Sequence, residues 1–194
     1  MTFEHVVVDS TEPAPGAVLL VGIPGSGKST VAAALAARFP RSAHIEVDHL
    51  QELIVRGGHW PTPEGDPEAD RQILLRARHA CLLADSFVAA GFLPVVDDVV
   101  VRRSHLDFYR ARVTTGPLHL VVLAPGPETA WERNNARHKK LTTNWAFLDE
   151  AMRAELSDQG VWIDNADQTV EETVDAVLEA TGLGSASRAG IRPS

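Results

Sequence analysis

Short apolar runs alternate with amphipathic stretches along almost the whole chain. The run AVLLVG at residues 17–22 is continuous, which is typical of a parallel strand covered on both faces. Further apolar runs predict strands at residues 43–48, 92–100, 118–125 and 160–165. Between them, apolar positions at helical spacing predict helices at residues 29–39, 68–90, 104–113, 127–140, 144–156 and 169–180. Five strands interleaved with helices predict an α/β domain, a doubly wound parallel sheet with helices on both faces.

Glycine, proline and polar residues mark the boundaries of these elements. Residues 57–67, GGHWPTPEGDP, predict a loop, and Thr169 with Glu172 has the spacing of a helix capping box. The segment 4–9, EHVVVD, is a candidate for an additional edge strand. We expect one domain over residues 1–182, with a lid at about residues 134–145, and a flexible tail at residues 183–194.

Composition and charge narrow the classes of function. The chain has 18 lysines and arginines against 26 aspartates and glutamates, a formal net charge of -8 that disfavours nucleic acid as a partner. No apolar run reaches the roughly 18 residues that span a bilayer. The segment MTFEHVVVDS has an acidic residue where a secretory signal carries basic ones, and Cys81 is the single cysteine. We therefore expect a cytoplasmic protein with no membrane partner.

The segment GIPGSGKST, residues 22–30, follows the first predicted strand and opens the first predicted helix. Its glycines and Lys28–Ser29 match the phosphate-loop pattern G-x-x-x-x-G-K-[ST], in which backbone N–H groups and a helix N-terminus hold a polyphosphate. Lys28 is expected to bridge the β- and γ-phosphates, Ser29 to bind magnesium and Thr30 to lie near the α-phosphate. The alternative is a glycine-rich turn with no ligand. The predicted nucleotide-binding residues, for ATP with Mg²⁺, are Gly22, Gly25, Ser26, Gly27, Lys28, Ser29 and Thr30.

Carboxylates close two of the predicted strands at the edge where ligands bind in such sheets. Asp97 and Asp98 end the third strand, and we expect at least one of them to hold magnesium. Asp97 is the candidate for magnesium and Asp98 for contact with the substrate, but which of the two faces magnesium stays open. Asp48 ends the second strand, where it can accept a proton from a bound hydroxyl as the general base of phosphoryl transfer. A solvated pair of strand-end acids, and a helix N-cap at Asp48, are the structural alternatives.

Two arginines one helical turn apart are candidates for binding the transferring phosphate. Arg133 and Arg137 project from the same face of the predicted helix at residues 127–140, where a mobile lid can bring them over the phosphates. Ordinary surface arginines are the alternative. The cationic run continues through residues 138–140, HKK, which we expect to be solvated lid residues.

The loop at residues 57–67 leads into the long helix, where related folds build the acceptor pocket. His59, Trp60 and Arg71 are candidates for contacting the acceptor, Trp60 by stacking. The eight histidines show no metal-ligand spacing, and we expect structural roles for His44 and His49 and no transition-metal site.

Several segments together resemble a known family. The order of GIPGSGKST, HIEVDHLQELI, a long helix, FLPVVDDVV and LHLVVLAPGPETAWERNNAR is similar to that of chloramphenicol phosphotransferase-like proteins of the P-loop kinase superfamily. This resemblance implies the fold of nucleoside monophosphate and shikimate kinases, ATP and magnesium as cofactors, and a small-molecule hydroxyl as acceptor. It implies that Asp48 is the catalytic base and that Arg133 and Arg137 belong to the lid. Residues 57–67 depart from the expected chloramphenicol-binding segment, so chloramphenicol itself is not implied.

These observations predict an ATP-dependent phosphotransferase that acts on a hydroxyl of an antibiotic or a hydroxylated metabolite. Two alternatives stay open. One is a kinase acting on nucleic acid ends or nucleotide-sugars, and the other is a regulatory nucleotide-binding module that transfers no phosphoryl group to a small acceptor. Asp48 distinguishes the second from a kinase, because a pure switch needs no base beside an acceptor pocket. The identity of the acceptor, the preference for ATP over GTP and the oligomeric state are left undetermined.

Overall fold

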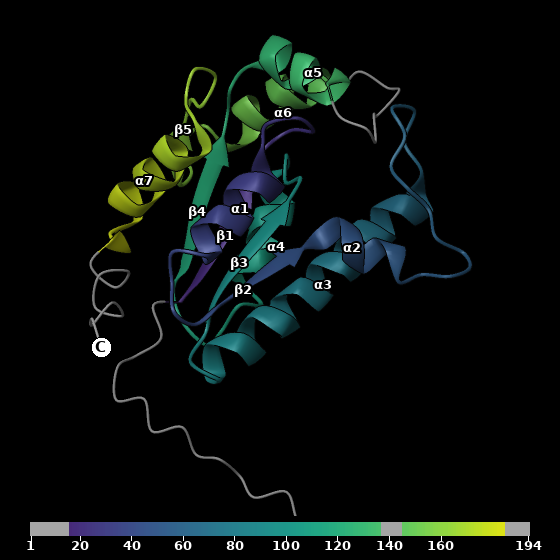
Figure 1. Cartoon of the computed structure of the whole chain (residues 1–194). Coiled ribbons are helices and arrows are strands. Elements are labelled where there is room, and N and C mark those ends of the chain that lie inside the picture. Colours follow the sequence, from purple (N-terminus) through teal and green to yellow (C-terminus); the bar gives the residue numbers. More distant parts are fainter. Residues whose placement is uncertain (1–15, 137–144, 185–194) are drawn as a thin grey trace, which may run out of the picture.

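A computed structural model describes residues 16–136 and 145–184. It contains a five-stranded, all-parallel sheet in the order β2-β3-β1-β4-β5, which confirms the predicted fold class (Figure 1). The strands are β1 (Ala17–Val21), β2 (Ser42–Glu46), β3 (Leu93–Asp98), β4 (Leu118–Leu123) and β5 (Val161–Ile163). The candidate edge strand at residues 4–9, lid residues 137–144 and tail residues 185–194 lie outside the described part of the chain.

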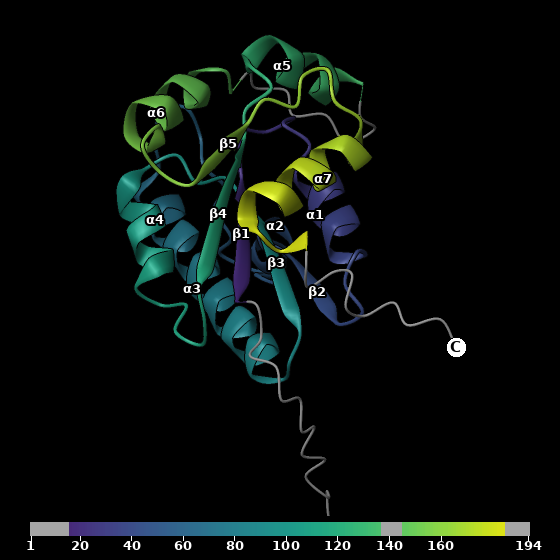
Figure 2. The ribbon, with the colours of Figure 1, turned by 90° about the vertical axis from the view of Figure 1, so that its left-hand side faces the viewer.

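Helices cover both faces of the sheet (Figure 2). On one face lie α1 (Lys28–Ala36) and α7 (Val170–Thr181). On the other lie α3 (Pro67–Ala89), α4 (Arg103–Arg110) and α6 (Phe147–Leu156). The short helix α2 (Val47–Glu52) follows β2 directly, and α5 (Pro127–Asn135) lies near the carboxyl ends of the central strands. The carboxyl ends of the strands are where we expect a functional site, because ligands bind there in open α/β sheets.

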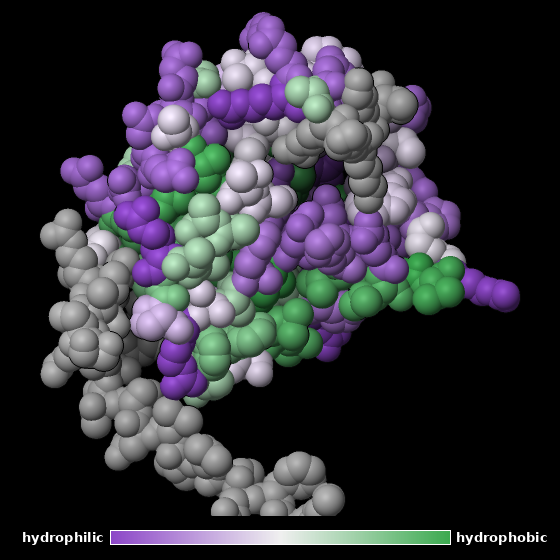
Figure 3. Space-filling view, in the orientation of Figure 1, coloured by the Kyte–Doolittle hydropathy of each residue, from purple (hydrophilic) through white to green (hydrophobic). Residues whose placement is uncertain are grey.

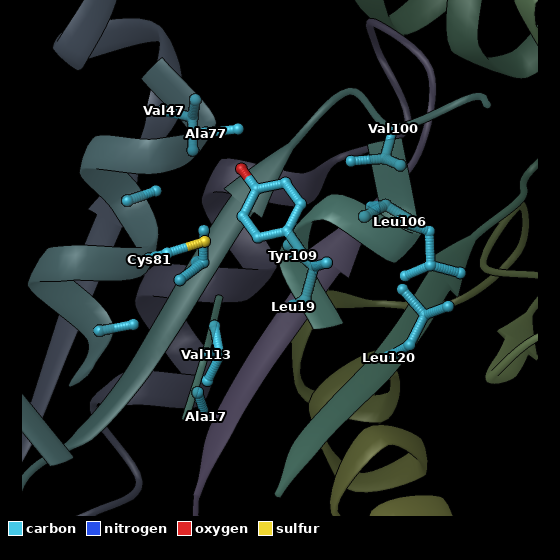
Figure 4. Packing of buried hydrophobic residues seen from close by; sticks show 14 of the residues in the cluster. Ala17, Leu19, Val47, Ala77, Cys81, Val100, Leu106, Tyr109, Val113 and Leu120 are labelled. Atoms are coloured by element: carbon cyan, nitrogen blue, oxygen red, sulfur yellow. The ribbon is translucent and has the colours of Figure 1, made fainter. Parts of the chain in front are cut away.

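A hydrophobic core lies on each face of the sheet, and β1 contributes side chains to both because successive residues of a strand point to opposite faces. Leu19 and Val21 pack with α3, α4 and α6, whereas Val18 and Leu20 pack with α1 and α7. Figure 4 shows the ring of Tyr109 in the middle of the first core, among residues that include Leu19 and Cys81. Burial raises the pKa of the Cys81 thiol to about 12, so this thiol stays protonated at neutral pH.

The long helix α3 has a well-defined start. The side chain of Asp66 accepts a hydrogen bond from the backbone N–H of Glu68 at 2.8 Å, and Pro67 occupies the first turn. Hydrophobic residues appear on the surface over α3 in Figure 3, and Leu75, Leu82 and Leu83 of this helix have exposed side chains. Within residues 16–136 and 145–184, none of the helices has the length and hydrophobicity needed to span a bilayer.

Candidate active site

The segment between β1 and α1 is folded so tightly that a side chain on Gly22 or Gly25 would displace neighbouring atoms. Gly25 and Gly27 have φ angles of 89° and 95°, in the left-handed region that favours glycine, and Gly27 is the N-cap of α1. A Cβ on Gly22 would lie 2.5 Å from Ser26 Oγ and 2.6 Å from the carbonyl oxygen of Leu123. In the phosphate-loop pattern, backbone N–H groups at the start of the helix that follows the loop bind the phosphates, and α1 begins at this point.

Replacing Gly25 with alanine should destabilise the fold more than left-handed strain alone explains. A Cβ at this position would lie 2.0 Å from the carbonyl oxygen of Ala130 in α5. Gly65 is a matched control, because it has a φ of +82° and a Cβ added to it would have no atom within 4 Å. We expect denaturant unfolding to show a loss of about 1 kcal/mol for Gly65→Ala and about 3 kcal/mol or more for Gly25→Ala. Equal losses would contradict close packing between the loop and α5.

Lys28 and Ser29 lie in the first turn of α1, and Ser29 faces the end of β3. Ser29 Oγ donates a hydrogen bond to Asp97 Oδ1 at 3.2 Å, and Lys28 Nζ donates to the carbonyl oxygen of Ile23 at 3.3 Å. Thr30 is exposed in the same turn. Ser29 and Asp97 thus present oxygen ligands next to each other, the donor set that magnesium prefers.

Asp98 points to the opposite face of the sheet and is buried, with an exposed fraction of 4%. Its carboxylate accepts hydrogen bonds from the hydroxyl of Tyr109 at 2.9 Å and from the N–H of Val99 at 2.8 Å. Burial raises the pKa of Asp98, and the nearby Arg76 guanidinium offsets part of that rise. Asp98, predicted to face the substrate, is therefore buried next to Arg76. Its role in substrate binding stays a prediction.

Arg76 connects Asp98 to the predicted catalytic base. Its Nη2 lies 3.7 Å from Asp98 Oδ1, and its Nη1 donates to Asp48 Oδ1 at 3.2 Å. The Arg76 side chain is only 6% exposed, whereas that of Asp48 is 53% exposed. The buried Arg76 guanidinium therefore binds Oδ1 of Asp48, while about half of the Asp48 side chain is exposed to solvent.

The expectation that Asp48 closes a strand is wrong, and so is the alternative that it caps a helix. The strand β2 ends at Glu46, which is the N-cap of α2, and Asp48 lies in the first turn of that helix. The chain leaves the sheet at Val47, which is fully buried and begins α2. Similarly, β3 ends at Asp98 rather than at residue 100.

Arg76 was not among the residues predicted from the sequence, although a signal was present. It lies on the apolar stripe of α3, three residues after Ile73 and four before Ala80, where a charged residue is buried. A charged side chain at a buried helical position requires a partner of opposite charge. That requirement points to the carboxylates at the carboxyl ends of the strands.

The predicted acceptor residues divide into two groups. Trp60 lies beside the group formed by Asp48, Arg76 and Asp98, because the Arg76 guanidinium carbon is 5.7 Å from the centroid of its ring. Its side chain is 47% exposed. Arg71 does not join, since it is exposed and its Nε donates to Glu68 at 2.8 Å within α3. His59 Nδ1 is 2.7 Å from Asp66 Oδ2, so its ring is tied to the start of α3.

Arg133 of α5 contacts both the phosphate loop and the segment that follows β5. It donates to the carbonyl oxygens of Asn165 at 2.8 Å and Ala166 at 3.0 Å, and its Nη1 is 3.5 Å from the carbonyl oxygen of Ser26. The side-chain amide of Asn165 also donates to the carbonyl oxygen of Ser26 at 3.1 Å. Arg133 therefore ties the phosphate loop to the segment after β5. Its predicted partner Arg137, with residues 138–140, lies outside the described residues.

Comparisons with known proteins agree with this architecture. The structure is similar to a sugar kinase from Janibacter sp. HTCC2649, with 21% identity, a TM-score of 0.65, and coverage of 89% of this chain and 97% of that chain. It is also similar to a gluconokinase from Sinorhizobium meliloti 1021, with 20% identity, a TM-score of 0.59, and coverage of 89% and 94%. A tunicamycin resistance protein from Deinococcus radiodurans gives 18% identity, a TM-score of 0.63, and coverage of 86% and 95%. At these identities the likeness establishes the fold.

The family assignment rests on the sequence rather than on the likeness to solved structures. No curated protein sequence matches the chain. The family model AAA_33, described as an AAA domain, matches residues 18–159, which include the phosphate loop and the strand-end aspartates. This match extends over more than half of the chain and confirms the predicted P-loop kinase superfamily. The chain therefore belongs to the AAA_33 family of AAA domains.

Proposed function

We propose that this protein is an ATP-dependent O-phosphotransferase that moves the γ-phosphoryl group of ATP to a hydroxyl of a small molecule. The observation that carries the proposal is Asp48, a half-exposed carboxylate held by the buried Arg76. The end of β3 lies between this pair and the nucleotide side: Arg76 also meets Asp98, and the adjacent residue Asp97, on the other face of the sheet, accepts from Ser29 in the phosphate loop. A module that only binds nucleotide has no need of this arrangement.

The phosphate-loop side holds the donor. Backbone N–H groups from Gly25 to Ser29 and the Lys28 ammonium bind the phosphates and stabilise the charge that develops during transfer. Ser29 and Asp97 would hold magnesium, which supplies charge neutralisation on the phosphate oxygens when it is bound. Arg133 fixes the loop after β5 against the phosphate loop, so the donor side is preorganised.

Asp48 acts on the acceptor. It takes the proton of the acceptor hydroxyl as the oxygen of that hydroxyl forms a bond to the γ-phosphorus. The bond between the γ-phosphorus and the bridging oxygen breaks, and ADP leaves with that oxygen. Arg76 orients the carboxylate by binding its Oδ1, which leaves the other oxygen available to the acceptor.

The acceptor is proposed to be a small hydroxylated molecule rather than a nucleic acid. The exposed ring of Trp60 lies beside the same Arg76 guanidinium that binds Asp48, and its flat apolar face suits a sugar ring or another compact scaffold. The structural neighbours include proteins named a sugar kinase, a gluconokinase and a tunicamycin resistance protein, so sugars, sugar acids and antibiotics are the first classes to test.

The test is a mass-spectrometric screen of purified protein with magnesium and ATP. The acceptor panel contains sugars, sugar acids, nucleosides, nucleotide-sugars, aminoglycosides, amphenicols, macrolides and tunicamycin, with an oligonucleotide as a separate arm. The proposal predicts a phosphorylated small molecule with stoichiometric ADP. Phosphorylation of the oligonucleotide alone would overturn it, and ATP binding without any product across a broad metabolite extract would favour the regulatory alternative.

A further inference from the structure

Three potential metal ligands meet at the carboxyl end of β2, on the side of the sheet that faces α1. His44 and Glu46 are two residues apart on β2 and therefore share a face, while Ile45 between them packs into the core on the α3 side. On the neighbouring strand, Asp97 is paired with Glu46 in the parallel register. The ligand atoms of His44, Glu46 and Asp97 all lie within 4.8 Å of one another.

The carboxylate of Asp97 has two oxygens that serve different neighbours. Oδ1 accepts from Ser29 in the phosphate loop, whereas Oδ2 is 2.5 Å from Nε2 of His44. Asp97 is almost fully buried, while the side chains of His44 and Glu46 are 23% and 30% exposed. An ion can therefore reach this group from solvent without entering between Asp97 and Ser29.

The ligand set differs from the one that accompanies ATP. Magnesium prefers oxygen ligands and retains several waters, whereas an imidazole nitrogen with two carboxylates suits Mn²⁺, Zn²⁺ and related ions. Three protein ligands also leave at least one position for water, as in zinc sites that keep an open coordination position. The imidazole of His44 makes this group selective for such ions.

We propose that His44, Glu46 and Asp97 form a binding site for a divalent transition-metal ion, such as Mn²⁺ or Zn²⁺, beside the phosphate loop. This site shares Asp97 with the magnesium position at Ser29, but it uses Oδ2 of that carboxylate, with His44 and Glu46, instead of Oδ1. It revises the expectation that His44 is purely structural, and it groups His44 with two carboxylates rather than with His49, the partner considered from the sequence. The proposal does not depend on the kinase activity, because the ion binds in the absence of nucleotide and acceptor.

The test measures Mn²⁺ binding to the chelator-treated, nucleotide-free protein by the EPR signal of free Mn²⁺. We expect a saturable site whose affinity falls at least about ten-fold in His44→Ala and in Glu46→Gln. His79→Ala is the matched control, because His79 is an exposed histidine on α3, and it should bind Mn²⁺ like the natural chain. Pulsed EPR should detect a nitrogen ligand to bound Mn²⁺ that disappears in His44→Ala.

Two further measurements separate the loss of a metal ligand from unfolding and from magnesium binding. Thermal unfolding without metal shows whether His44→Ala is folded, and added Mn²⁺ should raise the unfolding temperature of the natural chain but not that of the variant. Mg²⁺ should compete with Mn²⁺ only at concentrations at least about ten-fold higher. Equal binding by the natural chain and a folded His44→Ala variant, or equal competition by Mg²⁺, would leave only a hydrogen bond between His44 and Asp97 and would overturn the proposal.

Discussion

Replacing Lys28 with alanine is expected to lower the rate of phosphoryl transfer about 100- to 1000-fold and to weaken ATP binding. The ammonium group lies in the first turn of α1, at the loop whose backbone N–H groups are arranged for phosphates. Without it, the negative charge that shifts to the bridging oxygen of the leaving ADP loses one of the cations that stabilise it. Calorimetric titration measures ATP binding, and the rate is measured with the acceptor identified by the screen.

The control for Lys28→Ala must remove one positive charge without touching the site. Arg78 is exposed on α3, and Arg78→Ala changes the net charge by the same amount. We expect Arg78→Ala to retain the natural rate within a factor of about two, because a distant surface charge is screened by salt. A Lys28→Ala variant that binds ATP normally and transfers phosphate at the natural rate would show that this loop does not hold the triphosphate.

Asp48→Asn should reduce the turnover number about 100- to 10000-fold while leaving the affinity for ATP nearly unchanged. An amide cannot take the acceptor proton, but it retains the shape of the carboxylate and can still accept a hydrogen bond from Arg76 through its oxygen. The fold should tolerate the change, because Asp48 is half-exposed and Arg76 keeps its ion pair with Asp98. Steady-state kinetics and thermal unfolding of the same preparations separate the two effects.

A surface carboxylate provides the comparison for Asp48. Asp107 on α4 is 60% exposed and pairs with Arg110 in its own helix, an environment of similar exposure outside the site. Asp107→Asn should leave the turnover number unchanged. If Asp48→Asn lost less than a factor of about ten in turnover, another group would have to accept the proton, and the role proposed for Asp48 would be wrong.

The phosphate loop was predictable from the sequence because its physics is local. A buried strand, a glycine-rich turn and a helix that starts at lysine lie within one short segment, and the positive φ angles at Gly25 and Gly27 follow from the turn itself. The parallel sheet was predictable for a similar reason. Strands covered on both faces, such as β1, are apolar throughout, so they are visible in the sequence.

The boundary between β2 and α2 was not predictable in this way. Residues 43–48, AHIEVD, alternate strictly between apolar and polar positions, a pattern that predicts a strand continuing to Asp48. In the folded chain, β2 ends at Glu46 and α2 begins at Val47, which places Asp48 within α2. The alternation alone does not mark where the chain leaves the sheet, because Val47 belongs to the same core as Ile45.

The sequence by itself determined the family, the fold class, the phosphate loop and the edge of the sheet where ligands bind, because short-range patterns encode each of them. Only the tertiary structure decided which side chains meet there. Arg76 reaches Asp48 from another helix, and Arg133 reaches the carbonyl oxygens of the segment after β5. His44 on β2 reaches Asp97 on the neighbouring strand β3. Such contacts join residues far apart in the chain, and their partners are set by how helices pack on the sheet rather than by spacing in the sequence.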